Sequence, residues 1–131
     1  MKALIVGLGS IGHRHLSNLR YLEPATEIVV CHHSEQEGKS LDAGYWATSS
    51  LDEALDRKPD IAFVTGPTSV HVKTAMTIAE RGVHLFIEKP LSNSLSGLEE
   101  LFAMTQAASI KLMVGYNFRF HYPLQAMRQT L

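Results

Sequence analysis

Apolar residues along the chain gather into short unbroken runs, separated by longer segments of mixed character. Runs suited to buried strands lie at 3–6, 27–31, 61–65, 84–87 and 111–114, with a shorter candidate at 45–48. None of these runs alternates between apolar and polar positions, which is typical of parallel strands covered on both faces. The pattern therefore predicts a parallel sheet.

Helical spacing of apolar residues marks the segments between these runs, at 12–21, 50–57, 68–81 and 95–108. In the segment 68–81 the apolar residues keep to one face, and Gly82 stands where a left-handed residue would end the helix. A second apolar stripe begins at Leu95. Residues 34–44 show no such stripe, which leaves a loop or a poor helix as alternatives.

The alternation of strands and helices with short links predicts one doubly wound α/β domain, a parallel sheet with helices on both faces. A chain of 131 residues with 45% hydrophobic content is long enough for one such core. Ligands of this architecture bind outside the carboxyl ends of the strands. Functional residues are therefore expected in the segments that directly follow strands.

Charge and cysteine content narrow the possible partners. Twelve basic and thirteen acidic residues give a formal net charge of -1, so there is no global attraction to nucleic acid or to an anionic membrane. No apolar run approaches the ~18 residues of a spanning helix, and the first run breaks at Gly7 instead of continuing as a secretory signal. The single Cys31 precludes an intramolecular disulfide. We expect a soluble cytoplasmic protein without nucleic-acid or membrane partners.

A glycine-rich turn follows the first predicted strand and opens the first predicted helix. Its sequence is Gly7-Leu8-Gly9-Ser10-Ile11-Gly12. In this setting the first glycine makes a tight turn, the second lets a pyrophosphate approach bare backbone, and the third lets helix and strand pack closely. The amides at the helix N-terminus favour phosphate groups. The motif predicts a dinucleotide-binding Rossmann fold, with a glycine turn that holds no ligand as the alternative.

The end of the second predicted strand bears on the choice between NAD and NADP. An acid about 20 residues beyond the glycine motif would bond the adenosine ribose of NAD. The chain has Cys31 there, followed by three side chains that offer imidazole and hydroxyl groups, namely His32, His33 and Ser34. No arginine stands beside them, and neutral histidines bind phosphate less firmly than guanidinium does. The expected cofactor is NADP or NAD, with a modest preference for NADP.

Two further polar segments follow predicted strands at the same edge. In Gly66-Pro67-Thr68-Ser69-Val70-His71, Thr68 is expected to cap the next helix, a role compatible with ligand contact. In Glu88-Lys89-Pro90, Lys89 can reach a nicotinamide ribose or a substrate hydroxyl, and Pro90 is a candidate for a cis peptide bond. The alternative for Lys89 is a solvated side chain paired with Glu88.

Four segments in combination carry a family resemblance. They are the glycine motif with His13-Arg14-His15, then Pro67-Thr68-Ser69-Val70-His71, then residues 83–91 with Glu88-Lys89-Pro90, and finally Gly115-Tyr116-Asn117-Phe118-Arg119-Phe120. Together they resemble the glucose-fructose oxidoreductase/inositol dehydrogenase family, often called Gfo/Idh/MocA. The similarity runs from residue 2 to about residue 123.

The resemblance implies an NAD(P)-dependent oxidoreductase that transfers hydride between the cofactor and a hydroxyl or carbonyl carbon of a sugar, sugar derivative or cyclitol. It implies that residues 1–119 form the dinucleotide-binding domain and that 120–131 begin a second domain for substrate binding and homo-oligomer formation. In many relatives the acid/base histidine lies in that second domain. The chain alone is therefore expected to be inactive.

Site residues also follow from the resemblance, position by position. Lys89 is expected to be catalytic and to contact the nicotinamide ribose. The cofactor-binding residues would be Gly7, Gly9, Ser10, Ile11, Gly12, Thr65, Pro67, Thr68, His71, Glu88, Lys89 and Pro90. Tyr116, Asn117 and Arg119 would line the substrate mouth, or alternatively form only the structural crossover to the second domain.

Two other functions share such a glycine turn. A non-catalytic dinucleotide sensor has the same fold, and Lys89 argues against it. A methyltransferase that uses S-adenosylmethionine is disfavoured because the second strand end lacks an acid. Metal binding is not expected, since His13 and His15 are two residues apart on a helix and point to different faces. Both are expected to be surface or packing residues.

Overall fold

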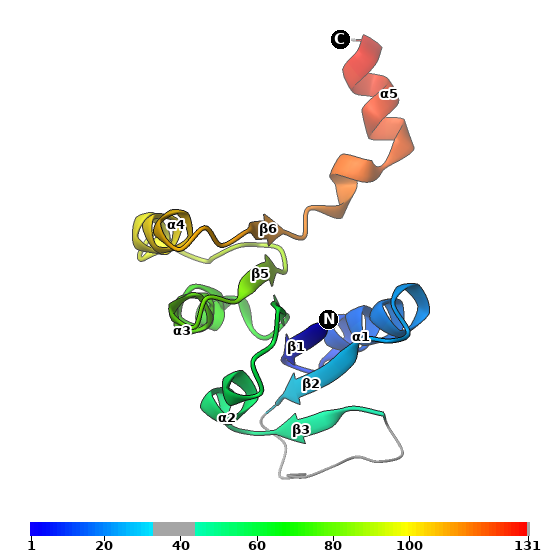
Figure 1. Ribbon diagram of the computed structural model, residues 1–131. Helices are drawn as coiled ribbons and strands as arrows, with labels where there is room; N and C mark the ends of the chain where they lie inside the picture. The colour runs from blue at the N-terminus through cyan, green and yellow to red at the C-terminus, as the bar shows by residue number, and fades with distance from the viewer. Residues whose placement is uncertain (33–43, 131) are drawn as a thin grey trace.

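The computed structural model describes residues 1–32 and 44–130. Its centre is one six-stranded sheet, parallel throughout, in the order β3-β2-β1-β4-β5-β6 (Figure 1). The strands are β1 (Lys2–Val6), β2 (Glu27–Cys31), β3 (Trp46–Thr48), β4 (Ile61–Val64), β5 (His84–Ile87) and β6 (Leu112–Val114). This is the strand order of a Rossmann fold, so the predicted fold class is confirmed, including the short strand within 45–48.

The described helices cover the two faces of the sheet unequally. On one face lie α2 (Leu51–Asp56), α3 (His71–Glu80) and α4 (Leu98–Ala107), while α1 (Ser10–Leu22) lies on the other (Figure 1). The neighbours Leu4 and Ile5 on β1 point to opposite faces and are both fully buried, each in a different apolar cluster. Burial on both sides explains why β1 has no polar alternation.

The face shared with α1 becomes more open toward β6. Ile5, Phe63, Phe86 and Met113 stand side by side across β1, β4, β5 and β6 on that face. Ile5 is fully buried and Phe63 and Phe86 are partly buried, whereas 43% of Met113 is exposed. Among the described elements, α1 thus shields the middle of the sheet and leaves its β6 side accessible.

Two predicted helices begin later than their sequence pattern indicated. The segment 68–81 divides into a 3-10 turn, Thr68–Val70, and α3. Thr68 is the first residue of that turn, and the N-cap of α3 is Val70, with no side-chain capping hydrogen bond. The predicted capping role of Thr68 was therefore wrong. The predicted helix 95–108 begins only at Leu98, because Gly97 has a left-handed φ of 78°. Leu95 is consequently 87% exposed and outside the apolar stripe.

Other boundaries agree with the sequence pattern. Gly82 follows α3 with a φ of 75°, the left-handed conformation predicted for it. The segment 34–44, predicted as a loop or a poor helix, lies outside the described residues apart from Gly44.

The chain leaves the sheet at its carboxyl end. After β6, a 3-10 turn (Asn117–Phe120) leads into α5 (Tyr122–Thr130), which projects away from the rest of the molecule (Figure 1). Six large side chains of this segment are exposed: Tyr116, Phe118, Phe120, Tyr122, Leu124 and Met127. None of the helices in the described part of the chain has the length and apolar character needed to cross a membrane.

Candidate functional site

The glycine-rich turn connects β1 to α1 and leaves backbone open to a ligand. Gly7 has a φ of 95°, a conformation that side chains rarely adopt. A Cβ at Gly12 would collide with the carbonyl oxygen of Gly7, so helix and strand need glycine there to pack. A Cβ at Gly9 would meet nothing within 4 Å, so the protein itself does not require glycine at that position. Bare backbone at Gly9, beside the first amides of α1, fits a dinucleotide pyrophosphate.

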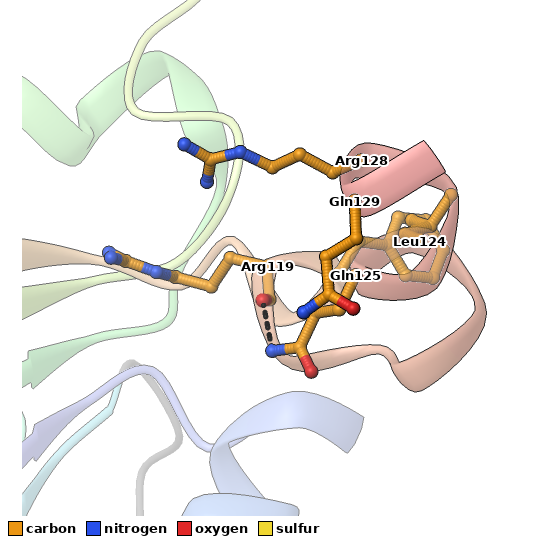
Figure 2. A pocket seen from close by; sticks show the side chains of 6 residues that line it. Arg119, Leu124, Gln125, Arg128 and Gln129 are labelled. Atoms are coloured by element: carbon orange, nitrogen blue, oxygen red, sulfur yellow. Dashed lines mark hydrogen bonds between the residues drawn. The ribbon is translucent and has the colours of Figure 1, made fainter. Parts of the chain in front are cut away.

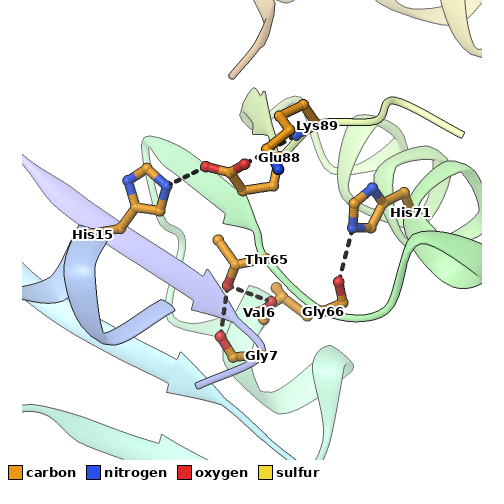
Figure 3. A network of polar contacts seen from close by, with 8 residues as sticks. All are labelled: Val6, Gly7, His15, Thr65, Gly66, His71, Glu88 and Lys89. Atoms are coloured by element: carbon orange, nitrogen blue, oxygen red, sulfur yellow. Dashed lines mark hydrogen bonds and ion pairs between the residues drawn. The ribbon is translucent and has the colours of Figure 1, made fainter. Parts of the chain in front are cut away.

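Thr65 stabilises this turn through hydrogen bonds of its side chain. Its buried hydroxyl lies 2.6 Å from the carbonyl oxygen of Gly7 and 3.1 Å from that of Val6 (Figure 3). The residue directly after β4 is thereby tied to the turn that follows β1. The sequence placed Thr65 at a ligand-binding edge, and the structure adds a contact within the protein that no motif indicated.

His71 links two loops at the carboxyl edge of the sheet. Its ring is buried at the start of α3, with Nε2 2.9 Å from the carbonyl oxygen of Gly66 and Nδ1 3.0 Å from that of Pro90. Figure 3 shows the contact with Gly66. Gly66 follows β4 and Pro90 follows β5, so one imidazole holds together the segments predicted to flank the nicotinamide. Pro67 and Thr68 lie in the first of these loops.

Glu88 is the most enclosed carboxylate at this edge. Its Oε1 lies 2.8 Å from His15 Nε2, and its Oε2 accepts a 3.0 Å hydrogen bond from the Lys89 backbone N–H (Figure 3). Lys89 itself is exposed, and the Lys89-Pro90 peptide bond is cis. The alternative of a solvated Lys89 paired with Glu88 holds only in its first part: the side chain is exposed, but the side chain that contacts this carboxylate is His15.

One pocket of about 540 Å³ brings the turn and the lysine together. Ile11 from the start of α1, Lys89 from the end of β5, and Tyr116 and Asn117 from beyond β6 all line it. Four predicted site residues from segments far apart in sequence thus face one space, with Glu88 as a fifth. The remaining lining residues are Arg14, His15, Asn18, Phe86, Met113, Gly115 and Phe120.

Arg119 lies at a different pocket, of about 670 Å³, beside α5 (Figure 2). It shares that pocket with Arg128 and Leu124, and its backbone carbonyl accepts a 3.0 Å hydrogen bond from Gln125 Nε2. Arg119 therefore lines a different pocket from Tyr116 and Asn117, with which the sequence had grouped it, although its backbone N–H donates a 3.2 Å hydrogen bond to the Tyr116 carbonyl oxygen. Pro90 lines a third hollow, which Tyr116 shares.

The end of β2 is described only in part. The His32 backbone N–H donates a 3.0 Å hydrogen bond to the Thr48 carbonyl oxygen, which continues the pairing of β2 with β3. His33 and Ser34, the other two residues predicted to surround an adenosine phosphate, lie outside the described residues. Burial raises the pKa of the Cys31 thiol to about 11.

Several pocket residues were not predicted from the sequence, although helical spacing along α1 could have indicated some of them. His15 was expected to be a surface or packing residue, and its ring does pack against Phe63 and Phe86. What the sequence did not indicate is its contact with Glu88 at the pocket. His15 lies four residues after Ile11, so the two share one face of α1. Extending the apolar stripe of α1 through Ile11 would have placed His15 toward the sheet. Across residues 1–32 and 44–130, no cluster of three potential metal ligands occurs.

Residues 1–116 match the family described as an oxidoreductase family with an NAD-binding Rossmann fold, Gfo/Idh/MocA. The chain belongs to this family. The predicted family and the prediction of an NAD-binding oxidoreductase domain are thereby confirmed. The match covers the glycine turn, the Glu88-Lys89-Pro90 segment and all six strands.

Named relatives are longer than this chain. The myo-inositol 2-dehydrogenase of Thermotoga maritima is 26% identical over 137 residues, an overlap that covers 100% of this chain and 40% of the relative. The 4-carboxy-2-hydroxymuconate-6-semialdehyde dehydrogenase of a Sphingobium species is 27% identical over 125 residues, covering 92% of this chain and 40% of the relative. The chain thus spans about 40% of the length of both relatives.

Solved structures share the fold. A probable dehydrogenase from Thermotoga maritima superposes with a TM-score of 0.85 at 26% identity, covering 98% of this chain and 40% of that one. The WlbA dehydrogenase of Bordetella pertussis, solved in complex with NADH and UDP-GlcNAcA, gives a TM-score of 0.86 at 23% identity, with coverage of 98% and 40%. The second likeness, at 23% identity, is evidence of fold alone.

Proposed function

We propose that this chain is the cofactor-binding part of an oxidoreductase that interconverts CH–OH and carbonyl groups of sugars, sugar derivatives or cyclitols. The observation that carries the proposal is the pocket shared by Ile11, at the start of the phosphate-binding helix, and Lys89. A dinucleotide whose pyrophosphate lies on the glycine turn would reach toward Lys89 with its nicotinamide half. Relatives that include an inositol dehydrogenase support the substrate class.

The residues of this chain would bind and orient the cofactor, and Lys89 would stabilise charge that develops on the substrate. A bound nicotinamide supplies the hydride chemistry. Gly7, Gly9 and Gly12 shape the turn, and Ser10 and Ile11 begin the helix that favours the phosphates. The Lys89 ammonium would contact the nicotinamide ribose, stabilise negative charge on the reacting substrate oxygen and assist its proton transfer.

Residues beyond β6 would connect this domain to the remainder of the substrate site. Tyr116 and Asn117 line the pocket that contains Lys89, which supports a role for both at the substrate mouth. Residues 120–131 would begin a second domain, and the exposed apolar side chains of α5 are consistent with a surface made to be covered. That second domain would supply the acid/base group and the contacts of a homo-oligomer, so the chain alone would turn over little or nothing.

The cofactor preferred would be NADP over NAD. The residues after β2 are histidines and a serine, which leaves no carboxylate at the expected position to repel a 2′-phosphate. His32, His33 and Ser34 would offer donors to that phosphate. The WlbA dehydrogenase, by contrast, was solved with NADH, so NADPH and NADH are the two cofactors to compare on this chain.

Parallel calorimetric titrations with NADPH and NADH test these proposals. The wild-type chain is expected to bind both, NADPH the more tightly, and Lys89→Ala is expected to weaken both. Lys73→Ala, an exposed lysine on α3, is the matched control and should leave affinity unchanged. Tighter binding of NADH would refute the NADP preference alone, whereas binding of neither cofactor would refute the proposed cofactor site in this chain.

A further inference from the structure

His15 is a partly buried polar residue on the helix that opens with the phosphate-binding turn. Its ring packs against two aromatic side chains of the sheet, with centroid separations of 5.3 Å to Phe63 and 5.0 Å to Phe86. Phe63 and Phe86 are themselves 5.3 Å apart. The imidazole is therefore held in place by apolar packing from β4 and β5, and its Nε2 is left to make one directed contact.

That contact is with Glu88, whose two oxygens serve different partners. Oε1 is 2.8 Å from His15 Nε2, and the exposed fractions of the two side chains are 15% and 11%. Oε2 accepts the backbone N–H of Lys89 at 3.0 Å. A hydrogen bond to a carboxylate that water barely reaches is stronger and more directional than one on the surface. The carboxylate thus connects α1 to the backbone of the lysine.

Space on one side of this carboxylate is filled, whereas another side borders the pocket of about 540 Å³ that Lys89 also lines. A Cβ built on Gly115 would come within 3.2 Å of Glu88 Oε1 and 3.1 Å of the Phe86 ring. Glu88 thus lies against the segment after β6 and contacts His15 of α1. A carboxylate that loses the His15 contact can turn toward this pocket, and its bond to the Lys89 amide would then weaken.

We propose that His15 is a positioning residue which, through Glu88, sets the place of Lys89 in the nicotinamide pocket. His15 lies on α1, whose first turn would bind the pyrophosphate, so the same helix fixes both halves of the cofactor site. This inference rests on the proposed function of Lys89. It assigns to His15 an effect on the nicotinamide half of the cofactor and none on the adenosine diphosphate half.

The test compares NADH with ADP, which lacks the nicotinamide ribose. Both dissociation constants are measured by calorimetry on the wild-type chain, His15→Leu, His15→Gln and Lys89→Ala. His15→Leu is expected to weaken NADH binding about tenfold and to leave ADP binding unchanged. His15→Gln retains an amide N–H donor for Glu88 and is expected to restore most of the loss. The double variant His15→Leu/Lys89→Ala should bind NADH no more weakly than Lys89→Ala.

The matched control is His13→Leu, an exposed histidine on the same helix, for which both affinities should stay at the wild-type value. Equal weakening of NADH and ADP by His15→Leu would indicate a structural role only and overturn the inference. Additive losses in the double variant, or no loss in His15→Leu, would overturn it as well while leaving Lys89 in place. A wild-type chain that binds NADH no better than ADP would refute the proposed role of Lys89, and this inference with it.

Discussion

The carboxyl edge of the sheet and the segment 116–130 meet at the pocket that contains Lys89, but they differ in how their side chains are held. At the edge, Thr65, His71 and Glu88 are buried, and each polar group has a partner in another segment. Beyond β6, aromatic and aliphatic side chains from Tyr116 to Met127 are exposed. The strand ends are stabilised by contacts within the domain, whereas the segment 116–130 presents apolar surface that the described residues leave uncovered.

The contrast implies that the same leucine-to-alanine substitution should lower the free energy of unfolding by different amounts in the two regions. Leu4→Ala removes a fully buried side chain from β1 and is expected to lower the free energy of unfolding by about 3 kcal/mol. Leu124→Ala removes a leucine on α5 that is 45% exposed, and is expected to change it by less than about 0.5 kcal/mol. Urea denaturation followed by circular dichroism measures both values. Similar costs would mean that α5 is packed as well as the sheet.

Within the glycine turn, two alanine substitutions separate packing from ligand binding. Gly12→Ala places a methyl group against the Gly7 carbonyl oxygen and is expected to cost about 2 kcal/mol of stability. Gly9→Ala meets nothing within 4 Å, so stability should be kept while NADH binding falls, because the methyl group occupies the path of the pyrophosphate. Urea denaturation and calorimetry together distinguish them. Undiminished NADH binding by Gly9→Ala would place the phosphates elsewhere.

The buried His71 and the exposed His121 can be compared by the effect of a leucine substitution on stability. His71→Leu removes the ring contacts to the carbonyl oxygens of Gly66 and Pro90, including the hydrogen bond donated by the ring N–H, and is expected to cost about 2 kcal/mol. His121→Leu, in the exposed segment, should cost less than about 0.5 kcal/mol. Thermal and urea unfolding of the two variants supply the measurement. A small loss for His71→Leu would show that the two loops are held by other contacts.

The smallest expected effect concerns ion pairs on the surface of the sheet domain. Arg81 lies 3.3 Å from Asp52 and 3.0 Å from Asp56, and all three side chains are exposed by 44% or more. Arg81→Ala should lower the unfolding free energy by about 0.5 kcal/mol at low salt, and by less in 0.5 M sodium chloride, as estimated for exposed pairs. Urea midpoints at both salt concentrations check this. A larger, salt-independent loss would point to packing of the arginine stem instead.

Most of the fold could be predicted because parallel strands buried on both faces leave an unmistakable sequence pattern. Leu4 and Ile5 pack on opposite sides of the sheet, so the run 3–6 is apolar throughout. The start of α4 was predicted too early because apolar spacing from Leu95 continued the stripe. Periodicity carries no information about the left-handed φ of Gly97, which ends the helical path there.

The candidate site was predictable as a set of strand ends but not as a network of contacts. The motifs located the glycine turn, Lys89, Tyr116 and Asn117, and these line or border one pocket. The pairing of His15 with Glu88 joins residues 73 positions apart, and no local pattern encodes such a contact. The same holds for the contact of His71 with the Pro90 carbonyl oxygen, 19 positions away. Long-range polar contacts depend on how helices settle on the sheet, which spacing alone does not fix.

The buried thiol at the end of β2 has a practical consequence for experiments on this domain. Cys31 is the chain's single cysteine, and with a pKa of about 11 it is almost wholly protonated at neutral pH. Because only the thiolate reacts with maleimides and related reagents, Cys31 should remain unlabelled. A cysteine introduced by Phe118→Cys would then be the sole fast-reacting site. A fluorophore attached there could report on the movements of the C-terminal segment without any change to the native cysteine.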